Sequence, residues 1–152
     1  MWPMYPKYYE ELELHKKIRS RGYLLTEPDI IDFARKFDPQ PFHIDPEYAR
    51  TTRFGGLFCS GVHLISISQR LMDEMSAQTA WIAGMGWDEV RFLTAGRPGD
   101  VLELETELTA KRESKSDPSR GVVHLTLKLL NQRNEVVLSY KAFGLIEKRP
   151  SS

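Results

Sequence analysis

Hydrophobic residues recur at helical spacing in the first half of the chain. Residues 26–37 combine an apolar stripe with Thr26 as a capping residue and Pro28 in the first turn, which predicts a helix ending before the following acid. Residues 45–50 open with Asp-Pro and predict a second, short helix. Residues 61–75 are apolar on nearly every side, which predicts a long helix buried in the core.

In the second half of the chain, hydrophobic and polar residues alternate instead. Such alternation is typical of strands with one buried face and one exposed face. The expected strands are residues 81–92, 102–110, 123–129 and 136–146, preceded by one or two short strands within residues 12–25. A buried helix followed by a meander of antiparallel strands, which need cover on only one face, predicts an α+β fold with a curved sheet wrapped around the helix.

Length and charge restrict the class of protein. At 152 residues the chain is expected to form one domain, with residues 1–11 as an irregular lead-in and residues 147–152 as a frayed tail. Lysine plus arginine equals aspartate plus glutamate at 21 each, which argues against a general nucleic-acid or anionic-membrane binder. No apolar run would span a bilayer, no secretory signal pattern opens the chain, and the single cysteine excludes an internal disulfide, so we expect a cytoplasmic protein.

The segment with the clearest chemical character holds an acid and a histidine, Asp38 and His43, joined by Pro39-Gln40-Pro41-Phe42. Because each proline fixes its own φ and disfavours helix in the residue before it, we expect a rigid loop that leaves the helix at Phe37. A carboxylate and an imidazole within reach of one water molecule can together carry out proton transfers. The competing interpretation is that Asp38 only turns the chain and that His43 is an ordinary loop histidine.

The run Asp38-Pro39-Gln40-Pro41-Phe42-His43-Ile44-Asp45 resembles the D-x-N-P-x-H-x-D signature of the MaoC-like dehydratases, which include the (R)-specific enoyl-CoA hydratases. Two further blocks of that family have counterparts here in the same order. They are Phe54-Gly55-Gly56 with Ser60-Gly61, and Val90-Arg91-Phe92 with Arg97-Pro98-Gly99-Asp100. Two residues depart from the family pattern, because Gln40 stands where asparagine is usual and Ser60 where histidine is usual.

The resemblance implies a single hot-dog fold, a homodimer with the two sheets joined edge to edge, and hydration or dehydration of an enoyl thioester. The substrate would be an acyl-CoA or acyl-carrier-protein thioester, and no cofactor or metal is expected. In the roles that the family assigns, Asp38 and His43 are catalytic, and the backbone N–H of Gly61 stabilises the thioester oxygen. An N–H at the start of a buried helix suits that role, since the helix dipole favours negative charge there. Weaker candidates for substrate contact are Gln40, Phe54, Gly56 and Ser60, although the residue type of Phe54 favours a plain core position.

Other reactive side chains are weaker candidates. Cys59 adjoins the proposed site, but a free cysteine behaves mostly as a small hydrophobic residue, which favours a structural role. The remaining histidines, His15, His63 and His124, lie outside the signature. No metal-ligand spacing and no phosphate-binding loop is present. The basic residues expected to meet a coenzyme A or carrier-protein handle are Arg53, Arg91 and Arg97.

Two other functions stay open. A hot-dog thioesterase commonly carries its acid on the central helix, whereas no aspartate or glutamate occurs in residues 61–72. A subunit that binds acyl thioesters without catalysis would fit the departures at Gln40 and Ser60.

Overall fold

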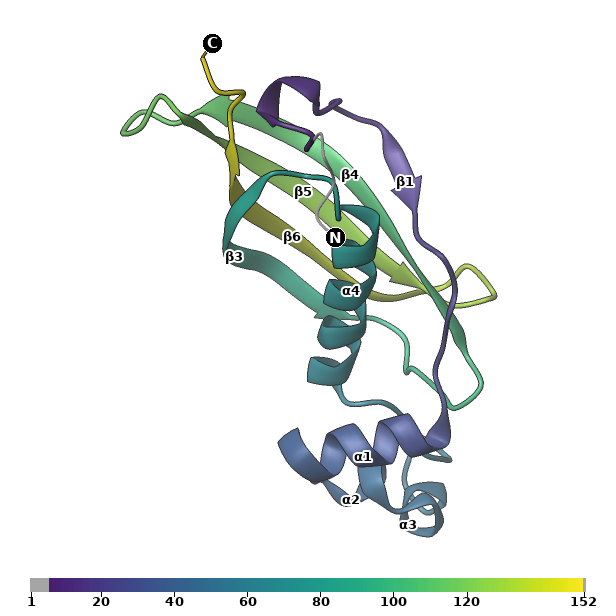
Figure 1. Cartoon of the computed structure of the whole chain (residues 1–152). Helices are drawn as coiled ribbons and strands as arrows, with labels where there is room; N and C mark the ends of the chain where they lie inside the picture. The colour runs from purple at the N-terminus through teal and green to yellow at the C-terminus, as the bar shows by residue number, and fades with distance from the viewer. Residues whose placement is uncertain (1–5, 152) are drawn as a thin grey trace.

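The computed structural model of the chain describes residues 6–151 and shows a long helix lying across one face of an antiparallel sheet (Figure 1). The helical elements are η1 (Tyr9–Glu11), α1 (Glu27–Phe37), α2 (Pro41–Ile44), α3 (Pro46–Arg50) and α4 (Gly61–Met75). The strands are β1 (Lys17–Arg19), β2 (Tyr23–Leu24), β3 (Trp81–Phe92), β4 (Val101–Glu113), β5 (Arg120–Leu130) and β6 (Val136–Glu147). The predicted α+β architecture, with the sheet around the residue 61–75 helix, is confirmed.

The sheet follows the order β1-β4-β5-β6-β3, with β2 also pairing with β4, and all of these pairs are antiparallel. Strands β4 to β6 form the expected meander. Strand β3 does not join it in sequence order, because β3 pairs with β6 and so lies at the opposite edge of the sheet from β1 (Figure 1). The connection from β3 to β4 therefore crosses the ends of two strands, which brings residues 93–100 close to the start of α4.

Helix α4 buries one face rather than its whole circumference. Leu64, Ile67 and Leu71 are buried in the main hydrophobic cluster together with leucines of β4, β5 and β6. Val62, on the other side, is 48% exposed. The prediction of an all-round buried helix is therefore wrong for the isolated chain, because the sheet covers only one side of α4. One polar pair lies under the helix, where the hydroxyls of Ser68 and Tyr140 are 2.6 Å apart and satisfy each other.

The two ends of the described chain are held against each other. Strand β6 runs through Glu147, the Lys148 N–H donates to the Ser119 carbonyl at 2.9 Å, and the Arg149 N–H donates to the Glu10 carboxylate at 3.0 Å. Residues 147–149 of the expected frayed tail are thus held by β6 and by hydrogen bonds to a backbone carbonyl and a carboxylate on neighbouring segments.

The lead-in is also more regular than expected. Lys7 forms a β-bridge with Thr79, and the Tyr9 ring lies so close to Gly121 that a Cβ on that glycine would be 2.2 Å from it. The Lys111 ammonium donates to the carbonyl of Tyr9 at 3.0 Å, which ties the segment to β4. Trp2 and Tyr5, which also belong to the lead-in, lie outside the described residues. Within residues 6–151, no helix combines the length and the apolar character needed to cross a bilayer.

Candidate active site

Asp38 is placed by the C-terminal end of α1. The helix begins as predicted, with the Thr26 hydroxyl accepting a hydrogen bond from the Asp29 N–H at 3.2 Å. Ile30 and Ala34 are fully buried on its inner face. The Asp38 N–H donates to the Ala34 carbonyl at 2.8 Å, so the packing of α1 determines where the Asp38 carboxylate lies.

His43 lies on a helical turn rather than on the expected loop. Pro41 occupies the first position of α2, where its fixed φ suits a helix and its missing N–H costs no hydrogen bond. The His43 N–H donates to the Gln40 carbonyl at 2.9 Å. The turn folds the imidazole back into the protein, and His43 is buried.

The imidazole of His43 is oriented by Phe58, which precedes α4. Nδ1 of His43 lies 2.7 Å from the Phe58 carbonyl oxygen, and the rings of Phe42 and Phe58 each meet the imidazole edge-on at 4.7 Å between centroids. A carbonyl oxygen only accepts hydrogen bonds, so Nδ1 must carry the proton. In the neutral imidazole, Nε2 is then the basic nitrogen.

Asp38 and His43 meet across the turn. Oδ2 of Asp38 lies 3.4 Å from Nε2 of His43, while Oδ1 of Asp38 accepts a hydrogen bond from the Gln40 amide at 3.0 Å. The side chain of Asp38 is 24% exposed and that of His43 5% exposed, so solvent reaches the pair from the carboxylate side. Gln40, a departure from the family signature, therefore orients the acid.

The start of α4 is formed by the other departure, Ser60. Its hydroxyl accepts a hydrogen bond from the His63 N–H at 3.3 Å and caps the helix. Gly61 is the first helical residue, so its N–H has no partner within the helix. A Cβ on Gly61 would be 2.7 Å from the Phe92 ring, which explains why a glycine suits this position.

The loop that includes Phe54 and Gly56 is fixed by Arg97. The Arg97 guanidinium donates to the carbonyls of Phe54 at 2.5 Å and Gly56 at 2.9 Å. Phe54 is 52% exposed and stacks on Phe58 at 4.2 Å, so the interpretation of Phe54 as a core residue is wrong. Arg97 is engaged with this loop rather than free to meet a coenzyme A handle. The sequence did not predict this structural role of Arg97, although it placed Arg97 in the Arg97-Pro98-Gly99-Asp100 block.

Neither Cys59 nor His63 has the properties of a catalytic residue here. Burial raises the pKa of the Cys59 thiol, which disfavours the nucleophilic thiolate. His63 stacks on Phe33 with centroids 4.3 Å apart, and burial lowers its pKa, partly opposed by Asp29. Among residues 6–151, no group of three or more His, Cys, Asp or Glu side chains is arranged to share a metal ion.

The sequence pattern of the MaoC like domain matches residues 11–128. The chain belongs to the MaoC-like domain family. This MaoC-like chain is 27% identical over 140 residues to the uncharacterized protein YdeM of Bacillus subtilis, with 91% of this chain and 98% of that protein covered.

Solved structures agree with this family. The MaoC-like dehydratase from Rhodospirillum rubrum superposes with a TM-score of 0.89 at 38% identity, covering 95% of this chain and 99% of that one. The (R)-hydratase from A. caviae gives a TM-score of 0.73 at 25% identity, covering 93% and 99%. A Mycobacterium tuberculosis protein with a double hot-dog fold gives 0.75 at 17% identity, covering 97% of this chain and 46% of that one. The hot-dog fold is thereby confirmed.

Removing the Gln40 amide is expected to lower turnover without unfolding the protein. Gln40→Ala frees Oδ1 of Asp38 and lets the carboxylate rotate. For the enoyl-thioester hydration that the family resemblance implies, we expect kcat to fall about tenfold with KM little changed. Gln40→Asn, which installs the usual family residue, should recover most of that loss. Gln69→Ala on the exposed side of α4 serves as the control. Equal kcat for Gln40→Ala and Gln69→Ala would contradict a positioning role.

Proposed function

We propose that this MaoC-like protein adds water reversibly to a trans-2-enoyl thioester and forms the (R)-3-hydroxyacyl thioester. The supporting observation is the 3.4 Å approach of Asp38 Oδ2 to His43 Nε2. With Nδ1 protonated, a neutral His43 presents a lone pair to the carboxylate, so both atoms are acceptors. Two acceptors at this distance repel each other. A water molecule that donates one hydrogen bond to each of them removes the repulsion, and that water is then held between two bases.

The proton balance of the reaction is complete with water alone. The pair removes one proton as the water oxygen bonds to C3 of the enoyl group. The same pair returns that proton to C2, so Asp38 and His43 end in their starting state. No redox partner or cofactor is required. A direct Asp–His ion pair explains the geometry less well, because charged N–H···O contacts are usually ~2.7–2.9 Å.

The N–H of Gly61 is proposed to bind the thioester oxygen. Negative charge builds on that oxygen when water adds to C3, and an unpaired N–H at the start of a long helix favours such charge. The chain Phe58–Cys59–Ser60 links the carbonyl that holds His43 directly to this helix start. The carbonyl that orients His43 and the proposed oxygen-binding N–H are therefore only three residues apart in the chain.

A homodimer would complete the surface around this site. Strand β3 is an edge strand, with one side of its backbone unpaired by the described sheet. Large apolar side chains around the site are exposed in the single chain: Phe37, Phe54, Val62, Phe92 and Leu93. A second copy that extends the sheet along β3 would cover part of this apolar surface.

An aspartate at Leu93 is expected to weaken that dimer. Light scattering should give twice the chain mass for the wild type and the mass of one chain for Leu93→Asp, because a charge would be buried in an apolar contact. Leu24→Asp places the same change at another exposed leucine, on β2, and should leave the mass unchanged. A wild-type protein with the mass of one chain would refute the dimer.

Two absorbance assays separate the candidate functions. Loss of the enoyl-thioester absorbance of crotonyl-CoA reports hydration, and release of free thiol reports a thioesterase. We expect the first signal with (R)-3-hydroxybutyryl-CoA as product, and no thiol release. The nearest helix acid, Asp73, is exposed and bonded to Gln69 at 2.7 Å, which does not favour a thioesterase. Thiol release without hydration would overturn the proposal.

A further inference from the structure

The sheet extends well beyond helix α4. Strand β4 has 13 residues and α4 has 15. With a rise of ~3.3 Å per residue in a strand and ~1.5 Å in a helix, β4 is about twice as long as α4. The end of the sheet that α4 does not cover carries the buried residues Leu108, Val123 and Ile146. The N-terminal arm, here residues 6–16, crosses this end instead, with Tyr9 and Leu12 packed on it.

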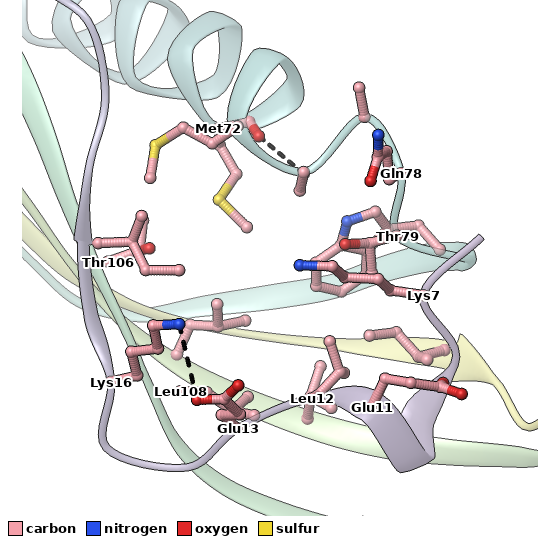
Figure 2. Close-up of a pocket in the computed structure, with 18 of the residues that line it drawn as sticks. Lys7, Glu11, Leu12, Glu13, Lys16, Met72, Gln78, Thr79, Thr106 and Leu108 are labelled. Carbon is pink, nitrogen blue, oxygen red and sulfur yellow. Dashed lines mark hydrogen bonds and ion pairs between the residues drawn. The ribbon is translucent and has the colours of Figure 1, made fainter. Parts of the chain in front are cut away.

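The arm does not fill the space above the sheet. A cavity of about 340 Å³ lies between the arm, the last turn of α4 and the strands (Figure 2). Its apolar walls include Leu12 of the arm, Met72 and Met75 of α4, and Trp81, Leu108 and Val123 of the sheet. Methionine side chains adapt readily to the shape of an apolar ligand. The cavity lies beyond the end of α4 that is farther from Asp38, so it is separate from the candidate active site.

The carboxylates at the cavity are paired with cations, and the charge that is left unpaired there is positive. Three carboxylates line it, and each has a cation within ion-pair distance. Their partners are Arg149 for Glu11, Lys16 for Glu13, and Arg21 for Glu74. Lys7 also lines the cavity, and no ion pair or hydrogen bond of its ammonium is found within residues 6–151.

The backbone of Lys7 is anchored beside the cavity. Its N–H donates to the Gln78 carbonyl at 2.6 Å, and its carbonyl accepts from the Ala80 N–H at 2.9 Å. Figure 2 shows the side chain reaching into the space bounded by Met72, Thr106 and Leu12. A cation beside a cavity that also has an apolar wall matches a ligand with an anionic head and an alkyl tail.

We propose that this cavity binds a medium-chain carboxylic acid, with the alkyl chain between Met72, Met75 and the sheet and the carboxylate on Lys7. The volume is near the lower end of small-molecule pockets, which span roughly 300–1,000 Å³, so a chain of about eight carbons suits it. The polar side chains of Gln78 and Thr79 line the cavity beside Lys7 and add hydrogen-bonding groups for the carboxylate. The site is independent of the proposed hydratase reaction.

Calorimetric titration of the full chain with sodium octanoate tests this site. We expect Lys7→Gln to weaken octanoate binding about fivefold, as for loss of one charge contact, and to leave binding of neutral 1-octanol unchanged. Lys115→Gln, at an exposed lysine on the β4–β5 loop, is the matched control and should bind octanoate like the wild type. Butanoate should bind more weakly than octanoate, by about threefold or more for each methylene removed.

Filling the cavity gives a second test that does not depend on charge. Met75→Trp should abolish binding of both octanoate and 1-octanol, with circular dichroism reporting that the fold is kept. The proposal is overturned if the wild type does not bind octanoate, or if Lys7→Gln binds it as well as the wild type. It is also overturned if Asp38→Asn weakens octanoate binding, because the acid would then occupy the candidate active site.

Discussion

Replacing Asp38 by asparagine is expected to lower kcat for the hydration of crotonyl-CoA by about 10³-fold. The asparagine is nearly isosteric and its Oδ1 still accepts the hydrogen bond from Gln40, so the shape of the site is retained. The change removes the negative charge and the basic oxygen beside His43 Nε2. Proton transfer by a positioned side chain contributes about 10²- to 10⁴-fold to turnover, and the expected loss lies within that range. The assay follows the decrease in enoyl-thioester absorbance.

A matched control separates the loss of the proposed catalytic carboxylate from the loss of one negative charge. Asp32→Asn makes the same substitution on the exposed side of α1 and should keep wild-type kcat. Thermal unfolding of Asp38→Asn should match that of the wild type, because Asp38 ends the helix through its backbone N–H and not through its carboxylate. Wild-type turnover in Asp38→Asn would exclude the carboxylate from the reaction.

The second largest effect is expected for Gly61→Ala. A methyl group at this position would be 2.7 Å from the Phe92 ring and would narrow the approach to the Gly61 N–H. Loss of one donor to a developing oxyanion costs about 10²- to 10³-fold in kcat. We expect a decrease of about 10²-fold, since the exposed Phe92 ring can move aside in part.

Gly84→Ala is the control for this substitution. A Cβ on Gly84 would meet nothing within 4 Å, so the same addition of a methyl group should be tolerated there. Both variants are measured with crotonyl-CoA, and both are checked for folding by circular dichroism. Wild-type kcat for Gly61→Ala would show that this N–H does not contact the substrate in the transition state.

Capping residues, prolines and hydrophobic patterns in the local sequence made much of the fold predictable. Thr26 and Asp45 cap α1 and α3, as their residue types and the following prolines indicated. The bounds of the long helix, residues 61–75, were predicted from apolar residues at helical spacing after Gly61 and from the change of pattern after Ser76. The alternation in residues 102–108 matches the buried positions of β4, and it breaks at the register shift before Ala110, which is exposed. In these segments, tertiary packing and local preference agree.

The remaining features depend on contacts between distant parts of the chain. The partner of His43 Nδ1 is a backbone carbonyl, that of Phe58, and a carbonyl leaves no signature in the sequence. The burial of only one side of α4 depends on the tertiary arrangement of the sheet. The place of β3 at the sheet edge follows from its pairing with β6. The alternation of residues within each strand does not specify which strand is its neighbour.

The candidate site also combines features that the sequence predicted with features that depend on contacts between distant residues. Spacing and residue type drew attention to Asp38 and His43 without deciding their role, and the family resemblance added Gly61. The structure brings Asp38 and His43 within 3.4 Å of each other. The exposure of Phe54 was not predictable, because a phenylalanine beside two glycines suits a core and a surface equally well. The role of Arg97 depends on carbonyls more than 40 residues earlier in the chain.

The most direct measurement is a double-mutant cycle on the acid and the imidazole. kcat/KM for crotonyl-CoA is determined for the wild type, Asp38→Asn, His43→Ala and the double variant. If both groups act on one water molecule, the double variant should be about as slow as the slower single variant, because either change already disables the shared proton transfer. Losses that multiply in the double variant would show that Asp38 and His43 act separately and would contradict the proposed mechanism.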